Sequence, residues 1–354
     1  MNIGKLLLTA SLACLALVGK VTAQDIHFSQ FYASPLNLNP ATTGVMPCDM
    51  RVSAIYRNQW ASVMGNRAFN TFSAGVEGKF RAGTHDYYGL GLTLWADKAG
   101  ASAFSTVQAA ISASYLKRLG GRRSNEQYLT AGGQIGITQR SIRTDDLTWG
   151  TQFDGDQYNG TLPTQENIAG TRKTYADFNA GLMYFAALDK KAQSNVYVGI
   201  AFSHLGRANV ALLNQGFEPL YMKFAVHGGG DFRVQRRFAI VPNFAFFLQG
   251  PSIQANFGSA IKFDFSKRAT SSQAFHVGLY TRIVTAQDEA GATDGADVDA
   301  LIVVTRVRFG SSNIGLSYDI NTSALRPGSR SNGAIELSYI YTLCGGRKSP
   351  MPCP

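Results

Sequence analysis

Histidine and cysteine are the side chains best suited to catalysis and metal binding, and in this sequence both are sparse. The chain contains no GxxxxGK[ST] phosphate-binding loop, no GxSxG nucleophile motif and no HExxH zinc motif. The five histidines lie far apart, without the close spacing that brings metal ligands together: His27, His85, His204, His227 and His276. We therefore expect no catalytic, cofactor-binding or metal-binding residues, and a protein that is not an enzyme.

The first 23 residues have the features of a signal peptide, so they are not expected to belong to the mature fold. A positive charge precedes an apolar stretch at 6–18, and the small residue Ala23 marks a cleavage site before Gln24. A lipoprotein modified at Cys14 is the alternative, but the apolar run continues beyond that cysteine. The protein is therefore expected to be exported.

Apolar and polar residues alternate along most of the chain after the signal peptide. One row contains Phe72, Val76 and Phe80, while the opposite row carries Glu77 and Lys79. Such alternation is typical of β-strands with one apolar and one polar face. The composition, 45% hydrophobic and 16% charged, argues against disorder. No later apolar run reaches the roughly 18 residues that predict a helical membrane span.

The alternation defines about 14 segments of roughly 12 residues, longer than most globular strands and close to the length that crosses a bilayer at a tilt. Their charged residues fall opposite the apolar rows, as expected when one face contacts lipid and the other lines a lumen. We predict an all-β fold, an up-and-down transmembrane β-barrel spanning residues 49–343. A soluble stacked-sheet protein is the alternative. The segments are 50–60, 69–80, 86–97, 103–117, 126–140, 173–187, 195–204, 220–233, 237–249, 252–265, 273–286, 298–309, 312–321 and 332–343.

The connections between these segments alternate in length and differ in charge. The longest are 141–172 and 205–219, and both are odd-numbered in chain order. Long odd connections are typical of a barrel whose first and last strands both end in the periplasm. The short connections are rich in Lys and Arg. They indicate either solvated turns or a basic periplasmic rim that faces anionic lipids or an acidic partner. Nucleic acid is not an expected partner of an exported barrel.

Three cysteines remain after the signal peptide. Cys48 precedes the first expected strand, Cys344 follows the last, and Cys353 lies near the C-terminus. The first and last strands of a closed barrel are neighbours, so a disulfide from Cys48 to either of the other two is geometrically natural in an oxidising compartment. Free thiols are the alternative.

The residues after the signal peptide form a specific pattern. Residues 24–41 read QDIHFSQFYASPLNLNPA, and Gly44 and the run YRNQW at 56–60 follow. The runs GLSYDIN at 315–321 and GAIELSY at 333–339 lie in the last two expected strands. Together these residues resemble the PorP/SprF family of the type IX secretion system of Bacteroidota. The middle of the chain is similar to that family only in length and alternation.

The resemblance implies an outer-membrane barrel that works in type IX secretion and gliding motility. Family members aid the export or surface attachment of cargo proteins, including adhesins, that carry type IX C-terminal domains. The implied partners are outer-membrane lipids, type IX secretion components and one such cargo, whose identity the resemblance does not give. The periplasmic tail at 344–354 departs from an aromatic chain end, which leaves open how the C-terminus engages a partner.

Residues 24–48 are expected to plug the barrel or to cover its periplasmic rim. The segment contains three prolines, which discourage regular strand pairing, and its aromatic stretch must be buried. Its Asn-Pro-Ala sequence is similar to the N-terminal stretch that plugs FadL-like transporters. A structural plug and a strap that docks a partner are both consistent with these features. The candidate residues, in this segment and in the first strand, are Phe28, Ser29, Gln30, Phe31, Asn39, Pro40, Arg57, Asn58, Gln59 and Trp60.

Two functions remain open. The first is a non-enzymatic secretion accessory, whose candidate cargo loop at 141–172 carries Leu147, Trp149, Phe153 and Tyr158. Aromatic and aliphatic anchors of this kind are enriched at protein interfaces, although they could equally pack the loop over the barrel mouth. The second is a passive FadL-like channel for hydrophobic or small solutes, which requires an open lumen.

Overall fold

The computed structural model describes ten stretches of the chain. The expected signal peptide at 1–23, Cys353 and most of the expected tail lie outside them. The described residues are 25–100, 102–120, 125–144, 147–164, 171–189, 194–212, 216–265, 273–287, 293–323 and 326–345.

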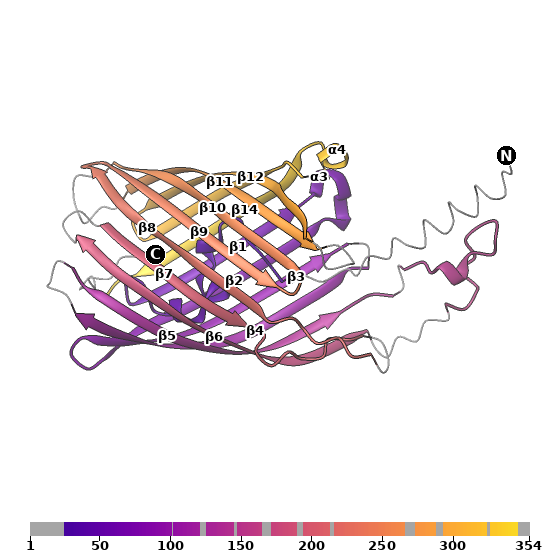
Figure 1. The fold of residues 1–354 in the computed structure, drawn as a ribbon, viewed down its shortest axis with the longest axis horizontal. Helices are drawn as coiled ribbons and strands as arrows, with labels where there is room; N and C mark the ends of the chain where they lie inside the picture. The colour runs from indigo at the N-terminus through magenta and orange to yellow at the C-terminus, as the bar shows by residue number, and fades with distance from the viewer. Residues whose placement is uncertain are drawn as a thin grey trace.

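Fourteen antiparallel strands form one closed barrel, in which each strand pairs with its neighbours in the chain and β1 pairs with β14 (Figure 1). The predicted all-β transmembrane barrel is thereby confirmed. In chain order the strands are β1 (Met50–Gln59), β2 (Phe69–Ala82), β3 (Asp86–Ala99), β4 (Phe104–Gly120), β5 (Gln127–Ser141), β6 (Arg172–Asp189), β7 (Ser194–Ser203), β8 (Lys223–Gln235), β9 (Phe238–Gln249), β10 (Ser252–Asp264), β11 (Gln273–Gln287), β12 (Thr293–Phe309), β13 (Ser312–Asn321) and β14 (Asn332–Leu343).

Most strand boundaries differ by a few residues from the alternation pattern, and two of the differences follow from strand pairing. β12 begins at Thr293 rather than at residue 298, because this acidic stretch pairs with the end of β11 through register shifts. β8 begins at Lys223 rather than at residue 220, because the Leu220 amide instead donates to the Ala208 carbonyl within the preceding loop. In both places the available pairing partner, and not the local sequence, sets the boundary.

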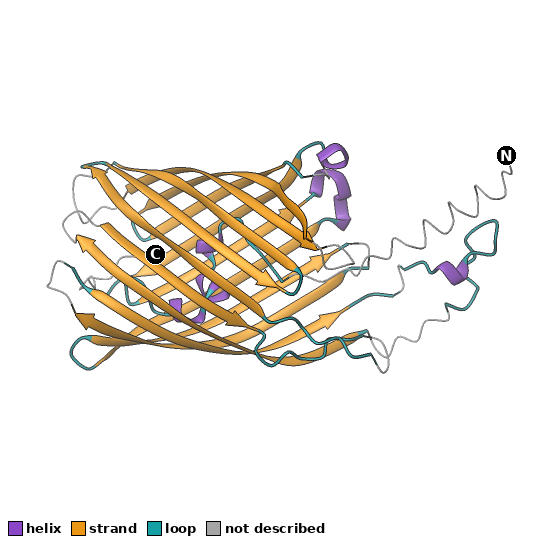
Figure 2. Ribbon diagram, viewed as in Figure 1, coloured by secondary structure: helices purple, strands orange, loops and turns teal. Residues whose placement is uncertain are grey.

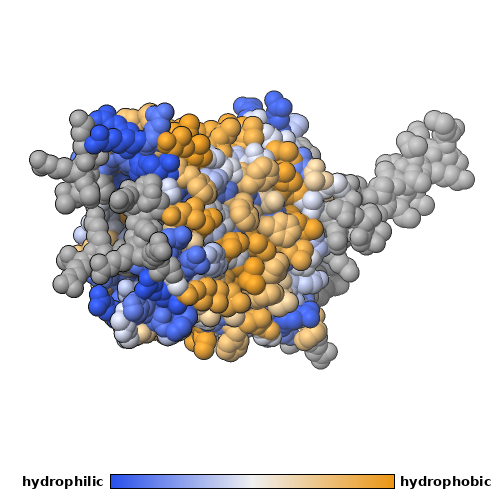
Figure 3. All heavy atoms as spheres, turned by 60° about the vertical axis from the view of Figure 1, so that its left-hand side comes forward, coloured by the Kyte–Doolittle hydropathy of each residue, from blue (hydrophilic) through white to orange (hydrophobic). Residues whose placement is uncertain are grey.

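The two faces of the barrel wall are those that the alternation predicts. Leu92 and Leu182 point outward and are 44% and 47% exposed, whereas Asp177 points inward and is 3% exposed. Apolar side chains form a band around the outside of the barrel (Figure 3). In the part of the chain that the structure describes, no helix is both long and apolar enough to span a membrane.

The two ends of the barrel differ in the length of their connections. One end carries the long β5–β6 and β7–β8 connections, together with the short helices α3 (Ala61–Met64) and α4 (Arg326–Ser329) (Figure 1). Shorter connections, such as the two residues between β8 and β9, lie at the opposite end. Because long loops are typical of the extracellular side of such barrels, the first end is called the outer end and the other the turn end.

Residues 25–48, called the inner segment from here on, lie inside the barrel (Figure 2). They form three short helices, η1 (Phe31–Ala33), α2 (Pro35–Leu38) and η2 (Pro40–Thr42). Proline occupies the first position of α2 and η2, where a missing N–H has no cost. The side chain of Asn39 caps η2 by accepting a hydrogen bond from the Ala41 amide at 2.8 Å.

Candidate functional site

Four charged side chains meet inside the barrel beside the first half of the inner segment, and they are called the ionic anchor. They are Arg57 on β1, Arg282 on β11, Asp319 on β13 and Glu336 on β14, and none is more than 3% exposed. Arg57 contacts Glu336 at 2.6 Å and Asp319 at 3.0 Å, and Arg282 contacts Asp319 at 2.8 Å. Each charge therefore has an opposite partner, which offsets the large desolvation cost of burying it.

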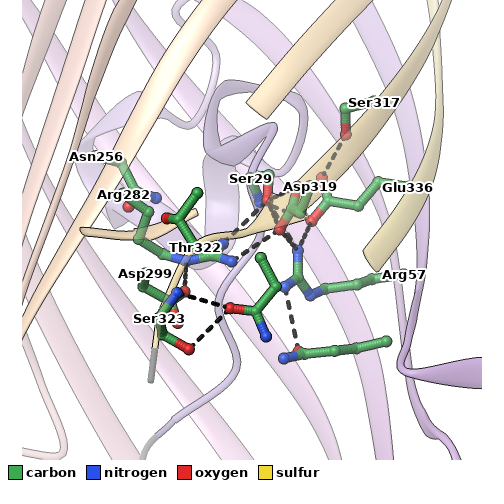
Figure 4. A network of polar contacts seen from close by, with 12 residues as sticks. Ser29, Arg57, Asn256, Arg282, Asp299, Ser317, Asp319, Thr322, Ser323 and Glu336 are labelled. Carbon is green, nitrogen blue, oxygen red and sulfur yellow. Dashed lines mark hydrogen bonds and ion pairs between the residues drawn. The ribbon is translucent and has the colours of Figure 1, made fainter. Parts of the chain in front are cut away.

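The inner segment binds directly to this anchor. The backbone amides of Ser29 and Gln30 donate to the two oxygens of Glu336, at 2.6 and 2.8 Å. The Ser29 hydroxyl lies 2.7 Å from Asp319 and accepts a hydrogen bond from Arg57 at 2.8 Å (Figure 4). A buried carboxylate bound by two consecutive amides fixes the backbone position and not only one side chain.

The start of the inner segment is held nearer the outer end by a second group of charges, called the outer latch. The Asp25 carboxylate lies 3.2 Å from both His204 Nε2 and Lys223 Nζ, and the Asp25 amide donates to Gln249 at 3.0 Å. The other ring nitrogen of His204 lies 2.9 Å from Asp177. His204 follows β7 with a φ of 60°, a left-handed conformation that is costly for a non-glycine residue.

The outer latch shifts the pKa of two of its groups. Burial alone would lower the pKa of His204, but the charge of Asp25 and the hydrogen bond to Asp177 raise it to about 9. Burial alone would raise the pKa of Asp25, yet Lys223 and His204 together hold it well below its usual range. The latch is therefore fully charged at neutral pH, with His204 protonated and both of its N–H groups donating.

His27 and Tyr32 differ from the latch because burial dominates their titration. Burial, followed by the nearby charges of Arg57 and Arg282, holds the pKa of His27 well below its usual range, so its ring is neutral at pH 7. Burial likewise raises the pKa of the Tyr32 hydroxyl. The Tyr32 ring also packs against the guanidinium of Arg306 on β12, 5.2 Å from the ring centre.

The second half of the inner segment contacts the opposite wall of the barrel with few charges. Asn39 Nδ2 donates to the carbonyls of Leu182 and Ile200 at 3.2 and 3.1 Å and lies 3.0 Å from His227. A Cβ at Gly132 on β5 would lie 2.5 Å from the Pro40 carbonyl oxygen. The wall therefore has no side chain where the segment's backbone approaches most closely.

One carboxylate and an apolar cluster complete this second contact, which is called the close-packed wall. The Gly44 amide donates to Glu77 at 2.6 Å, and Arg51 binds the other oxygen of Glu77 at 2.8 Å. The apolar cluster joins two residues of the segment to buried side chains of β4 to β7. Its members are Ala41, Val45, Leu116, Tyr128, Met183, Phe185 and Tyr197.

A disulfide joins Cys48, at the end of the inner segment, to Cys344, just after β14. The bond links the two strands that close the barrel at the turn end, since β1 begins at Met50 and β14 ends at Leu343. Cys353, the other candidate partner, lies outside the described residues.

The structure brings together most of the residues that the sequence singled out for the inner segment. Phe28, Ser29, Gln30, Phe31, Asn39 and Pro40 are all buried inside the barrel, and Arg57 contacts both Ser29 and Gln59. Asn58 and Trp60 lie apart from them. Asn58 donates to Asn70 on the neighbouring strand, and the Trp60 ring packs edge-on against Phe69.

Sequence reasoning missed the partners of these residues. It placed Arg282, Asp319 and Glu336 on the lumen face, but it did not connect them with Ser29. It also gave no role to His204 or Lys223. The available signal was a charge opposite an apolar row on each of β1, β11, β13 and β14, which indicates buried charges that need partners inside the barrel.

The candidate cargo loop lies at the outer end, apart from the inner segment. Phe153 and Tyr158 are exposed and form an isolated bridge with each other, whereas Leu147 and Trp149 are half-buried. Asp154 closes the turn between them by accepting hydrogen bonds from the amides of Asp156 and Gln157, at 3.0 and 2.9 Å. Two aromatic side chains are thus held on a defined turn in contact with solvent.

The chemistry that these sites show is recognition through hydrogen bonds and ion pairs. Within the described stretches, no three His, Cys, Asp or Glu side chains are grouped as they would be around a metal ion. The buried charges are paired with each other and with the inner segment, so they stabilise a filled barrel.

Comparisons with known proteins agree with this architecture. The family model described as "Type IX secretion system membrane protein PorP/SprF" matches residues 20–341. No curated protein matches the chain at a significant level.

Several solved barrels are similar in fold at low sequence identity. The toluene transporter TbuX of Ralstonia pickettii is 10% identical, with a TM-score of 0.46 over 88% of this chain and 94% of its own. The monoaromatic hydrocarbon channel CymD is 13% identical, with a TM-score of 0.44 over 92% and 95%. CdiB of Acinetobacter baumannii is 6% identical, with a TM-score of 0.45 over 83% of this chain, which spans only 60% of CdiB.

Proposed function

Because this chain belongs to the PorP/SprF family of type IX secretion system membrane proteins, we propose that it is a closed outer-membrane scaffold that aids the export or surface attachment of one cargo protein. The family and the barrel fold are those of an outer-membrane secretion component. The proposed cargo is an adhesin or another protein with a type IX C-terminal domain. In this function the barrel holds a partner and performs no chemical step.

The observation that carries the proposal is the filled lumen. The ionic anchor and the close-packed wall hold the inner segment against opposite sides of the barrel. The segment is also continuous with β1 and tied to β14 through Cys48. Displacing it would leave the charges of Arg57, Asp319 and Glu336 without part of their hydrogen bonding, which is costly in a buried site. A passive channel needs an open path through the lumen, whereas a scaffold tolerates a filled one.

Exposed aromatic side chains at the outer end support the proposed binding of a cargo protein. Phe153 and Tyr158 are 56% and 52% exposed on the β5–β6 connection and are bridged to each other. Exposed aromatic side chains at fixed positions are suitable anchors for a protein partner.

The test is surface proteomics of three strains. Deleting the gene should remove one surface protein while other type IX cargo remains. The double variant Phe153→Ser/Tyr158→Ser should release that same protein without lowering barrel abundance. Phe217→Ser, in the neighbouring loop, is the matched control and should leave the protein in place. An unchanged surface profile in the deletion strain would contradict the proposal.

A bilayer measurement separates the scaffold from the passive channel. The purified protein should give no steady conductance in planar bilayers, because the inner segment occupies the lumen. A steady current from the wild-type protein, together with loss of solute uptake in the deletion strain, would instead favour a channel of the FadL type.

A further inference from the structure

A third group of charges lies inside the barrel toward the turn end, where one of its members, Arg306, also packs against Tyr32 of the inner segment. It is called the charged belt and consists of Asp231 on β8, Lys262 on β10, His276 on β11 and Arg306 on β12. Lys262 and His276 are directly paired across β10 and β11, and His276 and Arg306 across β11 and β12. Lys262 Nζ reaches Asp231 at 2.5 Å. The proposed secretion function uses none of these residues.

The hydrogen bonds of His276 fix where its proton lies. Its Nδ1 atom faces two guanidinium nitrogens of Arg306, with Nε at 3.0 Å. Because a guanidinium can only donate hydrogen bonds, Nδ1 must be the acceptor. The ring is therefore neutral and carries its hydrogen on Nε2.

That Nε2–H group has no acceptor among the described residues, although His276 is only 3% exposed. A buried donor without a partner costs about 1–3 kcal/mol. Oδ1 of Asp231 is likewise buried without a donor. The belt thus holds one unsatisfied donor and one unsatisfied acceptor, on strands that flank Lys262.

The net charge of the belt indicates which kind of ligand would form hydrogen bonds with both His276 Nε2 and Asp231 Oδ1. Lys262 and Arg306 contribute two positive charges against the single negative charge of Asp231, so the belt has a net charge of +1. Arg308, two residues after Arg306 on β12, and Asp264, two residues after Lys262 on β10, add one charge of each sign near Lys262 and leave this balance unchanged. A neutral water would supply the hydrogen bonds but would leave this charge uncompensated.

We propose that the charged belt binds a phosphate group that enters from the turn end of the barrel. An oxygen of the phosphate accepts from His276 Nε2, Lys262 and Arg306 compensate its charge, and its hydroxyl donates to Asp231. Inorganic phosphate near neutral pH is a mixture of H2PO4⁻ and HPO4²⁻, and both species carry acceptor oxygens and at least one hydroxyl. A carboxylate has no hydroxyl that could donate to Asp231.

The first experiment follows His276 directly. The full-length protein, labelled with nitrogen-15 histidine in detergent, is titrated with inorganic phosphate and separately with acetate at equal ionic strength. Phosphate should shift the His276 Nε2–H signal with a saturable curve, and acetate should not. Equal shifts with both anions, or no shift at all, would overturn the proposal and leave only a water in the belt.

Variants test whether the shift arises in the belt. Lys262→Met should weaken phosphate binding about 10-fold, which is the effect of losing one charged contact worth roughly 1.4 kcal/mol. Lys173→Met removes a half-buried cation on the lumen face of β6 near the outer end and is the matched control, with no expected effect. Phosphate binding that is the same in all three proteins would refute the site.

Asp231→Asn keeps the proposal testable should Lys262→Met fail to fold. This change removes a negative charge and supplies an amide donor, so it should tighten phosphate binding several-fold. Calorimetric titration of the variant and the wild-type protein measures the difference without labelling. Weaker binding of phosphate to Asp231→Asn would contradict the assigned geometry.

Discussion

The inner segment is held by two contacts that use different physics. At the ionic anchor, Ser29 and Gln30 bind buried charges through hydrogen bonds of 2.6 to 2.8 Å. At the close-packed wall, Pro40 and Ala41 approach a strand at Gly132, where a single added carbon would collide with them. The ionic anchor depends on charged side chains, whereas the close-packed wall depends on the absence of a side chain at Gly132.

The difference predicts which kind of substitution should weaken each contact. Buried charges are costly to leave without partners, so the ionic anchor should fail when one charge is removed. Close packing tolerates little extra volume, so the close-packed wall should fail when an atom is added. Four predictions follow from this contrast.

The largest effect is expected from Asp319→Ala. Asp319 contacts Arg57, Arg282 and Ser29, and its removal leaves two buried guanidinium groups with fewer partners. Breaking a buried ion pair in this way costs about 3–5 kcal/mol. The measurement is the urea midpoint of the refolded barrel in lipid vesicles, read from the gel migration of folded and unfolded protein.

The exposed carboxylate of Asp156 provides the control for Asp319. Asp156→Ala should change the unfolding free energy by no more than about 0.5 kcal/mol, as is usual for surface positions. Equal midpoints for the two variants would show that the ionic anchor does not stabilise the barrel.

A smaller effect is expected from Gly132→Ala at the close-packed wall. The new methyl group would lie 2.5 Å from the Pro40 oxygen and 2.6 Å from the Ala41 nitrogen, and backbone atoms cannot move aside as a flexible side chain can. Overpacking of this kind costs about 1–3 kcal/mol. The same urea midpoint measures the loss.

The adjacent residue supplies a matched control. Gly133 points outward, and a carbon added there would meet only the Asn179 carbonyl oxygen at 3.9 Å. Gly133→Ala should therefore leave the midpoint nearly unchanged. If both alanine variants lose stability equally, intrinsic strand preference and not contact with the inner segment explains the Gly132 result.

These two contacts also differ in how far the sequence predicts them. Period-2 alternation predicts the barrel and the lumen face of Arg57, Asp319 and Glu336, because strand geometry fixes which side chains share a face. It does not predict that Arg57 meets the two carboxylates, since β1 becomes a neighbour of β14 only when the barrel closes. The resemblance to the PorP/SprF family pointed to Ser29 and Gln30, although without their partners.

The close-packed wall was beyond sequence reasoning. Gly132 and Gly133 are identical in the sequence, yet only one of them faces Pro40. A glycine has no side chain from whose size or polarity a contact could be predicted. The role of Gly132 is therefore known only from the path of the inner segment in the structure. The outer latch was not predicted either, because Asp25 and Lys223 are 198 residues apart in the sequence.

Asn39→Ala should have a moderate effect, and it tests whether hydrogen bonding adds to packing at the close-packed wall. Asn39 donates to two strand carbonyls and caps η2 through the Ala41 amide. Loss of a cap and its neighbouring bonds costs about 1–2 kcal/mol. Hydrogen exchange of residues 39–46 measures the change. Unchanged protection in the variant would mean that packing alone holds this half.

The smallest effect is expected from pH, and its alkaline part should act only on the first half of the inner segment. The pKa of His204 is raised to about 9, so its contribution is complete below the ordinary value of 6.5 and is lost as the pH rises through 9. The pKa of His27 lies well below 6.5, so the folded state binds its proton poorly and stability falls as the pH drops below 6.5. Attachment of residues 25–34 should therefore be strongest near pH 6.5 and weaken on both sides.

Hydrogen exchange of residues 25–34, corrected for the intrinsic dependence of exchange on pH, measures this optimum. His204→Gln should abolish the alkaline loss and leave the acid loss, while His27→Gln should do the reverse. Residues 39–46 are the internal reference for the alkaline loss. Asn39, Gly44 and apolar packing hold them to the close-packed wall, and the one histidine that Asn39 contacts, His227, belongs to β8 and is neutral at alkaline pH. An alkaline loss shared by both halves would show that the two contacts release together, and the ionic anchor and the close-packed wall would then be one cooperative unit.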